Sequence, residues 1–341
     1  MNILEMNLEN KIVTEHQTPP VNLSQADISL FEHEFTYQHT RPVLTPYRSV
    51  YFNSLGYIYN KYRLIFFKDC NKISDRPAYV NFIKLKILLT GRIDAPAISI
   101  HSIWCEGYFH WLTESLNRLM YIIQSGYHLN DYILLLPKKY LGYSYINESL
   151  SLFGFNLENI MPIEEYGNYL CKELLICPPL AIPGRYDYAV SNTASEYMLM
   201  KAGLNNLIAD RRVYISRQNS PKRKVTNELE LIKLLREYDF EIVETENMTF
   251  IQQMSLFNST RWLISIHGAG LTNMMFMQKH TNILEFREEN DKWNNCYFSL
   301  ASAHNLNYYY LKCKKEGEQK DHVGNLAVNI QELKQLMDLY I

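Results

Sequence analysis

The stretch Arg261-Trp-Leu-Ile-Ser-Ile-His-Gly-Ala-Gly-Leu-Thr-Asn273 decides the fold class of this chain. Its first half is apolar and β-branched, which is typical of a buried strand. The strand is followed by His267-Gly-Ala-Gly270, and the residues after this turn predict the start of a helix. Gly268 and Gly270 allow the backbone to turn sharply and leave its N–H groups open to a ligand. A strand that passes through such a turn into a helix is typical of open α/β sheets, which bind ligands outside the carboxyl ends of their strands.

This turn predicts an anion site. The N–H groups and the dipole of a helix N-terminus favour an anion such as phosphate, and His267 adds a side chain that can donate a hydrogen bond. A purely steric explanation stays open, because a tight strand-to-helix turn needs glycine whether or not it binds a ligand.

Alternating strands and helices surround this stretch. Strands are predicted at residues 213–216, 241–243, 262–266 and 282–286, and helices at residues 191–210, 227–238 and 250–258. The first half of the chain predicts a β-rich region at residues 40–105, a helix at residues 108–123 and strands at residues 132–136 and 174–177. Strands that alternate with helices indicate βαβ units and a parallel sheet, so the fold class is α/β.

The length of 341 residues exceeds what one hydrophobic core usually supports, so two domains are expected. We assign residues 1–190 to an N-terminal domain that begins with β structure, and residues 191–341 to a C-terminal Rossmann-like domain. The linker is expected near Pro183-Gly184, and the active site in the cleft between the domains. We expect the last helix to pack back on the N-terminal domain.

Composition excludes several classes of protein. Hydrophobic residues make up 47% and charged residues 21%, which indicates a folded globular chain. The net charge of −2 lacks the basic excess of a dedicated nucleic-acid binder. The six cysteines form no Cys-x-x-Cys pair, so neither a zinc site nor a disulfide framework is predicted. No apolar run approaches 18 residues, so we expect a cytoplasmic protein.

Cations follow the strand predicted at residues 213–216. Arg217 ends that strand, and Arg223 and Lys224 lie in the polar loop after it. The planar arginine side chain suits two-point contact with phosphate, and lysine supplies a point charge. A solvated position in a basic loop is the alternative for Lys222 and Lys224. Glu285 closes the strand predicted at residues 282–286 and could accept hydrogen bonds from ribose hydroxyls, although a surface or helix-capping role is equally open.

His110 and Glu114 lie four residues apart on the helix predicted at residues 108–123, so they share one face. Either group could deprotonate an acceptor hydroxyl as a general base. The alternative is a histidine packed in the core beside Trp111.

Several familiar motifs are missing from the sequence. No two aspartates are separated by a single residue, so the Asp-x-Asp metal site of many sugar transferases is not predicted. There is no Gly-x-Gly-x-x-Gly after a strand, no Walker A loop and no Gly-x-Ser-x-Gly elbow, which disfavours a dinucleotide oxidoreductase, a P-loop kinase and an α/β-hydrolase. We expect no metal and no cofactor, with arginine, lysine and helix N-termini neutralising charge.

In combination, these segments resemble glycosyltransferase family 61. The resemblance runs in order through residues 110–119, 214–217, 223–231, 240–244, 266–273 and 282–285. It implies a GT-B architecture, in which two Rossmann-like domains face a central cleft, here with a β-rich N-terminal extension. It also implies inverting, metal-independent transfer, with the donor sugar nucleotide on the C-terminal domain and the acceptor on the N-terminal one.

The resemblance also assigns roles to individual residues. His110 and Glu114 become the candidates for acceptor activation. The implied donor-binding residues are Arg217, Arg223 and Lys224 at the diphosphate, His267, Gly268, Ala269, Gly270, Leu271 and Asn273 as its cradle, and Glu285 at the ribose.

The resemblance implies a nucleotide-sugar donor and a glycan or lipid-linked glycan acceptor, and we expect a role in the synthesis of bacterial capsule or lipopolysaccharide. Peripheral contact with the inner membrane would then come through the lipid-linked acceptor. No nucleic-acid partner is expected. Two alternatives remain: a sugar-nucleotide epimerase or hydrolase on the same fold, and a non-catalytic glycan-assembly or binding protein. The sequence leaves the donor base, the linkage and the oligomeric state open.

Overall fold

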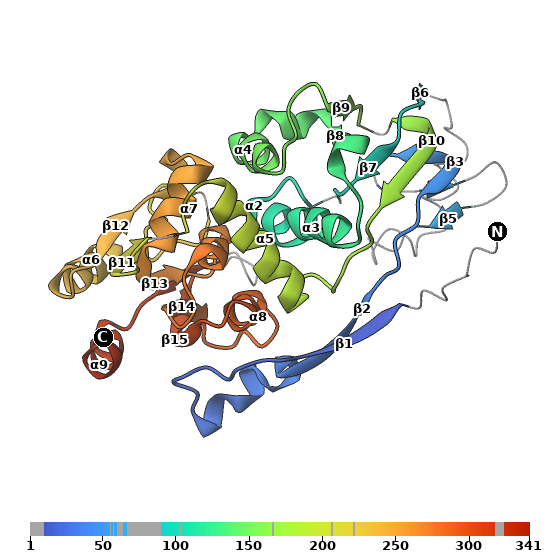
Figure 1. Ribbon diagram of the computed structural model, residues 1–341. Coiled ribbons are helices and arrows are strands. Elements are labelled where there is room, and N and C mark those ends of the chain that lie inside the picture. The colour runs from blue at the N-terminus through green and yellow to red at the C-terminus, as the bar shows by residue number, and fades with distance from the viewer. Residues whose placement is uncertain are drawn as a thin grey trace. The chain divides into compact units, whose positions relative to one another are not determined.

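The computed structural model describes residues 10–54, 56, 58–59, 64–66, 90–101, 104–165, 167–205, 207–220, 222–317 and 324–341. The chain divides into two compact units (Figure 1). The first comprises Met1–Val13 and His39–Ile182, and the second comprises Thr14–Gln38 and Pro183–Ile341. Within the described ranges, no helix combines the length and the apolar character needed to cross a membrane.

The first unit is built on a mixed sheet of eight strands. Its strands are β3 (Tyr47–Asn53), β4 (Ile58–Tyr59), β5 (Leu64–Phe66), β6 (Gly91–Ile93), β7 (Ala97–Ser99), β8 (Ile133–Pro137), β9 (Ile160–Ile163) and β10 (Asn168–Ile176). The order is β5-β4-β3-β10-β7-β8-β9, and β6 also pairs with β10. Strands β10, β7, β8 and β9 are parallel, whereas β3, β4 and β5 are antiparallel to their neighbours.

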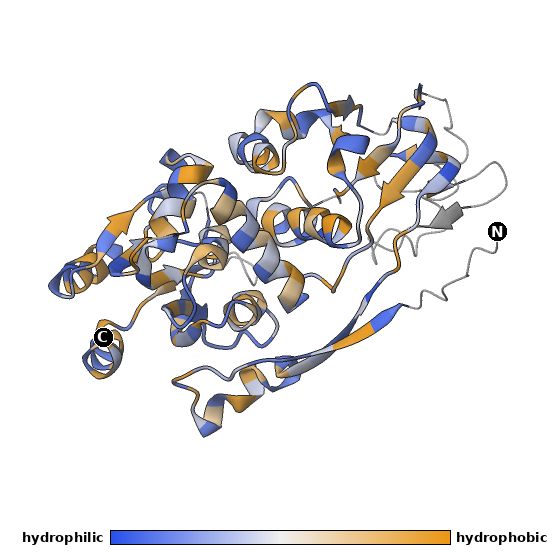
Figure 2. Cartoon of the chain, in the orientation of Figure 1, coloured by the Kyte–Doolittle hydropathy of each residue, from blue (hydrophilic) through white to orange (hydrophobic). Residues whose placement is uncertain are grey.

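Helices of the first unit follow the parallel strands. They are α2 (Tyr108–His110), the π-helix η3 (Trp111–Ser115), α3 (Leu116–Gln124), η4 (Leu129–Asp131), η5 (Lys138–Gly142) and α4 (Ser144–Leu152). Segments α2, η3 and α3 are consecutive and form the helix predicted at residues 108–123. Hydrophobic residues dominate α3 and the strands β7 and β10 (Figure 2), in keeping with the apolar core of this unit.

The second unit contains a sheet that is parallel except at one edge. Its strands are β11 (Arg211–Ile215), β12 (Glu241–Val243), β13 (Thr260–Ile266), β14 (Asn282–Glu288), β15 (Asn307–Glu316) and β16 (Asn325–Ala327), in the order β12-β11-β13-β14-β15-β16. Only β16 is antiparallel to its neighbour. Strand β13 is buried from Trp262 to Ile266, as expected for a parallel strand covered on both faces.

The helices of the second unit are α5 (Tyr188–Lys201), α6 (Glu228–Glu237), η6 (Thr245–Asn247), α7 (Phe250–Asn258), the 3₁₀-helix η7 (Ala269–Phe276), α8 (Cys296–Ala303) and α9 (Ile330–Tyr340). The last helix packs on α6, and its Leu333 and Met337 are fully buried in the core of this unit. The expected contact of this helix with the N-terminal domain stays a prediction.

Residues 14–38 belong to the second unit, although the sequence analysis placed residues 1–190 in one domain. This segment carries the 3₁₀-helices η1 (Gln25–Leu30) and η2 (Glu32–Glu34) between β1 (Lys11–His16) and β2 (Thr36–Arg41), which pair with each other. The N–H of Val21 donates to the carbonyl of Tyr308 at 2.8 Å. Phe31 is fully buried, with its ring 5.1 Å from that of Phe298. Burial of this aromatic side chain holds the segment on the second unit.

The α/β class and its parallel sheets confirm the coarse prediction. The strands and helices expected at residues 213–286 are all present, and α7 has the predicted bounds. The helix predicted at residues 191–210 was too long: α5 ends at Lys201, because Gly203 adopts a φ of 72°, a left-handed conformation that ends helices. The β-rich region predicted at residues 40–105 contains β3 to β7, and its residues 67–89 lie outside the described part.

Candidate functional site

The strand order of the second unit defines where a ligand would bind. The chain passes from β11 outward to the edge strand β12 and returns to β13 on the other side of β11, so the order reverses between β11 and β13. In open parallel sheets, the crevice at the carboxyl ends of such a pair of strands is the usual ligand site. Arg217 lies two residues beyond the end of β11, and His267 follows the last residue of β13.

Arg217 organises the loop that follows β11. Its guanidinium donates hydrogen bonds to the carbonyl of Arg223 at 3.2 Å, to Oγ of Ser220 at 2.8 Å and to the carbonyl of Lys222 at 3.2 Å. Burial lowers the pKa of Arg217, and the nearby Arg223 cation adds to the effect. Within the described residues, no carboxylate lies at ion-pair distance from Arg217, so its charge is available to an anionic ligand.

The guanidinium of Arg217 also rests on Gly268. A Cβ atom added to Gly268 would lie 2.9 Å from Nη1 of Arg217, which is closer than real Cβ contacts. Glycine at this position therefore allows the arginine to reach the turn after β13. Arg217 and Gly268 were both predicted at the site, and the structure brings them into contact.

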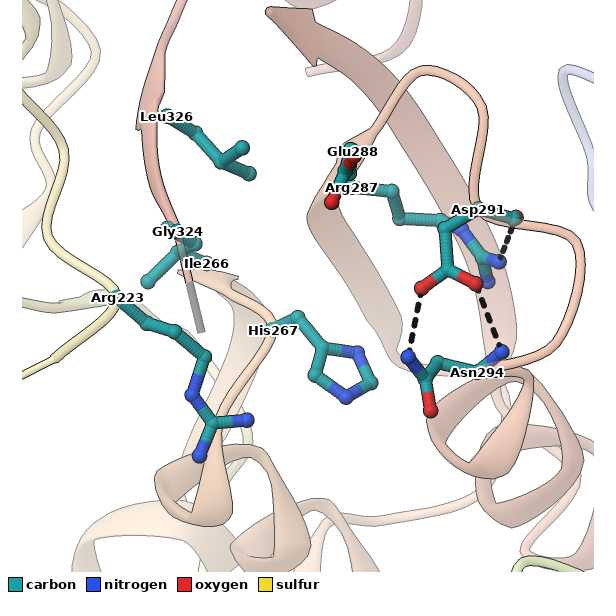
Figure 3. A pocket seen from close by; sticks show the side chains of 9 residues that line it. All are labelled: Arg223, Ile266, His267, Arg287, Glu288, Asp291, Asn294, Gly324 and Leu326. Atoms are coloured by element: carbon teal, nitrogen blue, oxygen red, sulfur yellow. Dashed lines mark hydrogen bonds between the residues drawn. The ribbon is translucent and has the colours of Figure 1, made fainter. Parts of the chain in front are cut away.

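Arg223 combines two unusual features. Its backbone φ is 56°, in the left-handed region that non-glycine residues seldom adopt. Its Nε is buried, with no hydrogen-bond partner among the described residues. Strained backbone is found where the surrounding structure requires it, often in ligand sites. The side chain lines a pocket (Figure 3), so its guanidinium is a candidate anion ligand.

This pocket lies entirely within the second unit. It is lined by Arg223, Ile266, His267, Arg287, Glu288, Asp291, Asn294, Gly324 and Leu326. In Figure 3 the ring of His267 lies between Arg223 and Asn294. Asp291 accepts hydrogen bonds from the backbone and the side-chain amide of Asn294, at 3.0 and 2.8 Å. Burial raises the pKa of Asp291, but these bonds and that from the Trp293 N–H outweigh it, so the pKa is lowered.

A buried carboxylate holds His267. Oε1 of Glu285 lies 2.5 Å from Nδ1 of His267, and Oε2 accepts a hydrogen bond of 2.5 Å from the hydroxyl of Tyr308. Glu285 is fully buried. Burial and the Glu285 charge raise the pKa of Tyr308 well above its usual range, so this hydroxyl stays a donor. A ribose hydroxyl would have to displace one of these bonds, and the predicted contact of Glu285 with ribose stays a prediction.

The helix after the glycine turn is a 3₁₀-helix that begins at Ala269, with Gly268 as its N-cap and no side chain capping it. The first N–H groups of a helix have no partners within the helix, so this turn can receive an anion through Ala269 and Gly270. Leu271 and Asn273 are fully buried. The Asn273 amide donates to the side chain of Gln253 at 2.9 Å, which directs it to α7 and away from the predicted ligand.

Lys224 lies beside the pocket without lining it. Its N–H donates to Oδ1 of Asn325 at 3.0 Å, and its carbonyl accepts from the N–H of Leu326 at 2.9 Å. These bonds fasten the basic loop to β16. The backbone of Lys224 therefore joins this loop to β16, and the predicted contact of its charge with the donor stays a prediction.

The candidate acceptor-side residues lie in the first unit. Nδ1 of His110 is 2.5 Å from Oε1 of Glu114, and Oε2 of Glu114 is 3.9 Å from Nη2 of the buried Arg118. The pair spans the junction of α2 with the π-helix η3, a helix type that is frequent at functional sites. The side chain of His110 is 28% exposed and lies beside Trp104, with ring centroids 5.7 Å apart. Because Nδ1 faces Glu114, Nε2 is the nitrogen that can serve a substrate.

Sequence reasoning missed Arg287 and Tyr308. Arg287 lies two residues after Glu285 on β14, and this spacing puts both side chains on one face of the strand. The spacing could therefore have identified Arg287 from the sequence. Tyr308 lies on β15, and its approach to Glu285 depends on how two strands align. No local pattern reveals that alignment.

Comparison with known proteins adds a family match. The profile described as Glycosyltransferase 61 matches residues 108–284, a range that contains both histidine sites and ends one residue before Glu285.

Three similar proteins carry the name EGF domain-specific O-linked N-acetylglucosamine transferase. The Drosophila melanogaster protein is 34% identical over 116 residues, covering 33% of this chain and 21% of that protein. The Rattus norvegicus protein is 23% identical over 291 residues, covering 80% and 51%. The Mus musculus protein is 23% identical over 284 residues, covering 77% and 50%. The chain thus spans about half the length of the rat and mouse relatives.

Proposed function

This chain belongs to glycosyltransferase family 61, and we propose that it transfers a sugar from a nucleotide-activated donor to a hydroxyl group. The observation that carries the proposal is the pocket at the carboxyl ends of β13 and β14, which Arg223 and His267 line. Arg223 enters this pocket with a buried Nε that has no partner among the described residues. A nucleoside diphosphate would supply the oxygens that this guanidinium lacks.

The donor diphosphate is proposed to bind between the two loops that follow β11 and β13. Arg217 and Arg223 neutralise its charge from one loop. His267 and the N–H groups of Ala269 and Gly270 receive it from the other. These groups stabilise the negative charge that grows on the leaving group in the transition state, and transfer is proposed to need no metal ion.

For the acceptor, we assign His110 as the general base and Glu114 as the residue that orients it. Glu114 engages Nδ1, which leaves Nε2 to take the proton of the acceptor hydroxyl. The acceptor oxygen then forms a bond to the anomeric carbon, on the face opposite the nucleotide. The bond from that carbon to the phosphate oxygen breaks, and its electron pair leaves with the nucleoside diphosphate. The sugar is thereby inverted.

The proposal retains the GT-B architecture of two Rossmann-like domains. It also retains bacterial capsule or lipopolysaccharide glycan, free or lipid-linked, as the acceptor class. A second candidate acceptor is a hydroxyl of an EGF-like domain, which the names of the fly, rat and mouse relatives favour. The same names favour N-acetylglucosamine as the sugar. A hydrolase or epimerase remains the rival enzyme, and it would need no acceptor.

Nucleotide binding is the first test. Calorimetric titration with UDP, GDP, CMP and dTDP, with and without EDTA, is expected to give binding by one series that EDTA leaves intact. Arg223→Ala should abolish it. Arg211→Ala is the matched control, because Arg211 begins β11 and pairs with the exposed Glu241, at the end of the strand opposite to the site. A folded wild-type protein that binds no nucleotide would contradict the proposal.

Product analysis separates the acceptors. The donor that binds is labelled in its sugar and incubated with lipid-linked glycan, with a folded EGF-like domain, or alone. Label in one acceptor identifies its class, whereas free or isomerised sugar in the absence of any acceptor would replace the transferase by a hydrolase or epimerase. His110→Gln should remove transfer and leave the nucleotide affinity unchanged, since His110 lies in the first unit.

A further inference from the structure

His267 is held from behind by a chain of buried polar groups. Glu285, which contacts its Nδ1, uses its second oxygen to accept a hydrogen bond from Tyr308. Nη1 of Arg287 lies 3.2 Å from the Tyr308 hydroxyl and 4.0 Å from Oε2 of Glu285. All of these groups except the ring of His267 are nearly or fully buried. A buried carboxylate needs such partners, because an uncompensated charge away from water is costly.

The chain continues to the opposite wall of the pocket. Nη2 of Arg287 donates to the carbonyl of Asp291 at 3.1 Å, and Asp291 binds Asn294, which lines the pocket as His267 does (Figure 3). The guanidinium of Arg287 lies over the ring of Phe31, 4.9 Å from its centroid. The N-terminal segment therefore covers the back of this chain of contacts. Arg287 therefore links the contacts behind His267 with those behind Asn294, and both of these residues line the pocket.

We propose that Tyr308 and Arg287 are positioning residues for donor binding: they fix Glu285 so that it holds Nδ1 of His267 and directs Nε2 to the donor diphosphate. This inference rests on the proposed function. The geometry explains why the carboxylate has no contact with the pocket itself. One oxygen of Glu285 contacts His267, the residue proposed to touch the ligand. The other accepts the hydrogen bond from Tyr308, which fixes the carboxylate. A histidine so held donates from Nε2 in a constant direction, as ligand-binding histidines do when a second group fixes the other ring nitrogen.

Tyr308→Phe isolates the contribution of one hydroxyl. The phenylalanine keeps the ring that packs on Phe298, at a centroid distance of 5.4 Å, so the fold should persist. Tyr309→Phe is the matched control. Tyr309 is the next residue on β15, so it points to the opposite face, where it packs on Trp262. Each variant therefore loses one tyrosine hydroxyl from strand β15.

Two measurements are made on wild type and both variants. The dissociation constant of the nucleoside diphosphate that wild type binds is expected to rise about tenfold in Tyr308→Phe and to stay unchanged in Tyr309→Phe. Proton–nitrogen spectra of the histidine rings in the unliganded protein, with His267 assigned through His267→Gln, should show altered Nδ1 and Nε2 shifts in Tyr308→Phe alone. Glu285→Gln, which keeps the shape of the side chain, should reproduce both changes.

The outcomes separate this inference from the proposed function. Wild type that binds no nucleotide contradicts the function, while the ring spectra still report whether Tyr308 fixes His267. Unchanged spectra and an unchanged dissociation constant in Tyr308→Phe, with wild-type binding intact, would overturn the positioning role. A loss of thermal stability with neither change would show that the hydroxyl only stabilises the core.

Discussion

Gly268→Ala tests the contact between the two loops of the donor site. An added Cβ would lie 2.9 Å from Nη1, 3.2 Å from Cζ and 3.3 Å from Nε of Arg217. The backbone of Gly268 has a φ of 175°, which is extended and open to any residue. Alanine therefore introduces no backbone strain, and its effect falls on the guanidinium of Arg217 alone.

The size of the effect follows from what holds Arg217. Its guanidinium makes three hydrogen bonds to the loop at residues 220–223, so it cannot retreat from the methyl group without breaking some of them. A hydrogen bond to a charged group contributes about 1.5 to 3 kcal/mol. If displacement of Arg217 removes one such bond to the diphosphate, nucleotide affinity falls roughly 10- to 150-fold.

Calorimetric titration of the nucleoside diphosphate measures this loss directly. Gly142→Ala is the control, because an added Cβ there meets no atom within 4 Å. Thermal melting of both variants establishes that they fold. An affinity of Gly268→Ala within twofold of wild type would refute the reasoning, since it would mean that Arg217 either moves without consequence or does not bind the donor.

Three further predictions concern other parts of the molecule. Burial lowers the pKa of His101 to about 4; the unfolded chain therefore binds its proton first as the pH falls from about 6.5 to 4, and about 3 kcal/mol of stability is lost over that interval. Urea denaturation at pH 7 and pH 4.5 should show a smaller loss for His101→Asn. Asn273→Ala should cost about 1 to 3 kcal/mol of stability, because Gln253 loses its buried partner, and should leave nucleotide affinity within about threefold of wild type, as titration would show. Initial transfer rates should be the same with EDTA as with added Mg²⁺ or Mn²⁺, and a rate that requires the ion would contradict metal-independent transfer.

Local patterns predicted most of the elements that carry the site. Helix α7 was found with its bounds, because its apolar spacing and the residues at both ends are contained in one short window. The helix predicted at residues 191–210 was too long, and the reason is also local. Gly203 has a left-handed backbone that ends the helix, and this glycine could have been read from the sequence. By contrast, nothing near residues 14–38 indicates that they pack on β15. Those contacts join residues about 290 positions apart, such as Asn22 and Tyr310.

The two histidine–carboxylate pairs show where sequence reasoning stops. His110 and Glu114 are four residues apart on one helix, so the period of the helix alone predicts their contact, and the structure gives 2.5 Å. His267 and Glu285 are 18 residues apart, one just beyond β13 and the other within β14. Their contact requires the parallel pairing of β13 with β14, in which Ser265 lies opposite Glu285.

The same difference bears on the ribose contact predicted for Glu285. A carboxylate at the end of a strand predicts a ligand contact when only its own strand is considered. In the folded sheet that carboxylate is enclosed between neighbouring strands, and burial forces it to use both oxygens on protein donors. Glu114, on a helix with one face toward solvent, keeps 16% of its side chain exposed and needs no such enclosure. In this chain the buried carboxylate of Glu285 contacts His267, which lines the pocket.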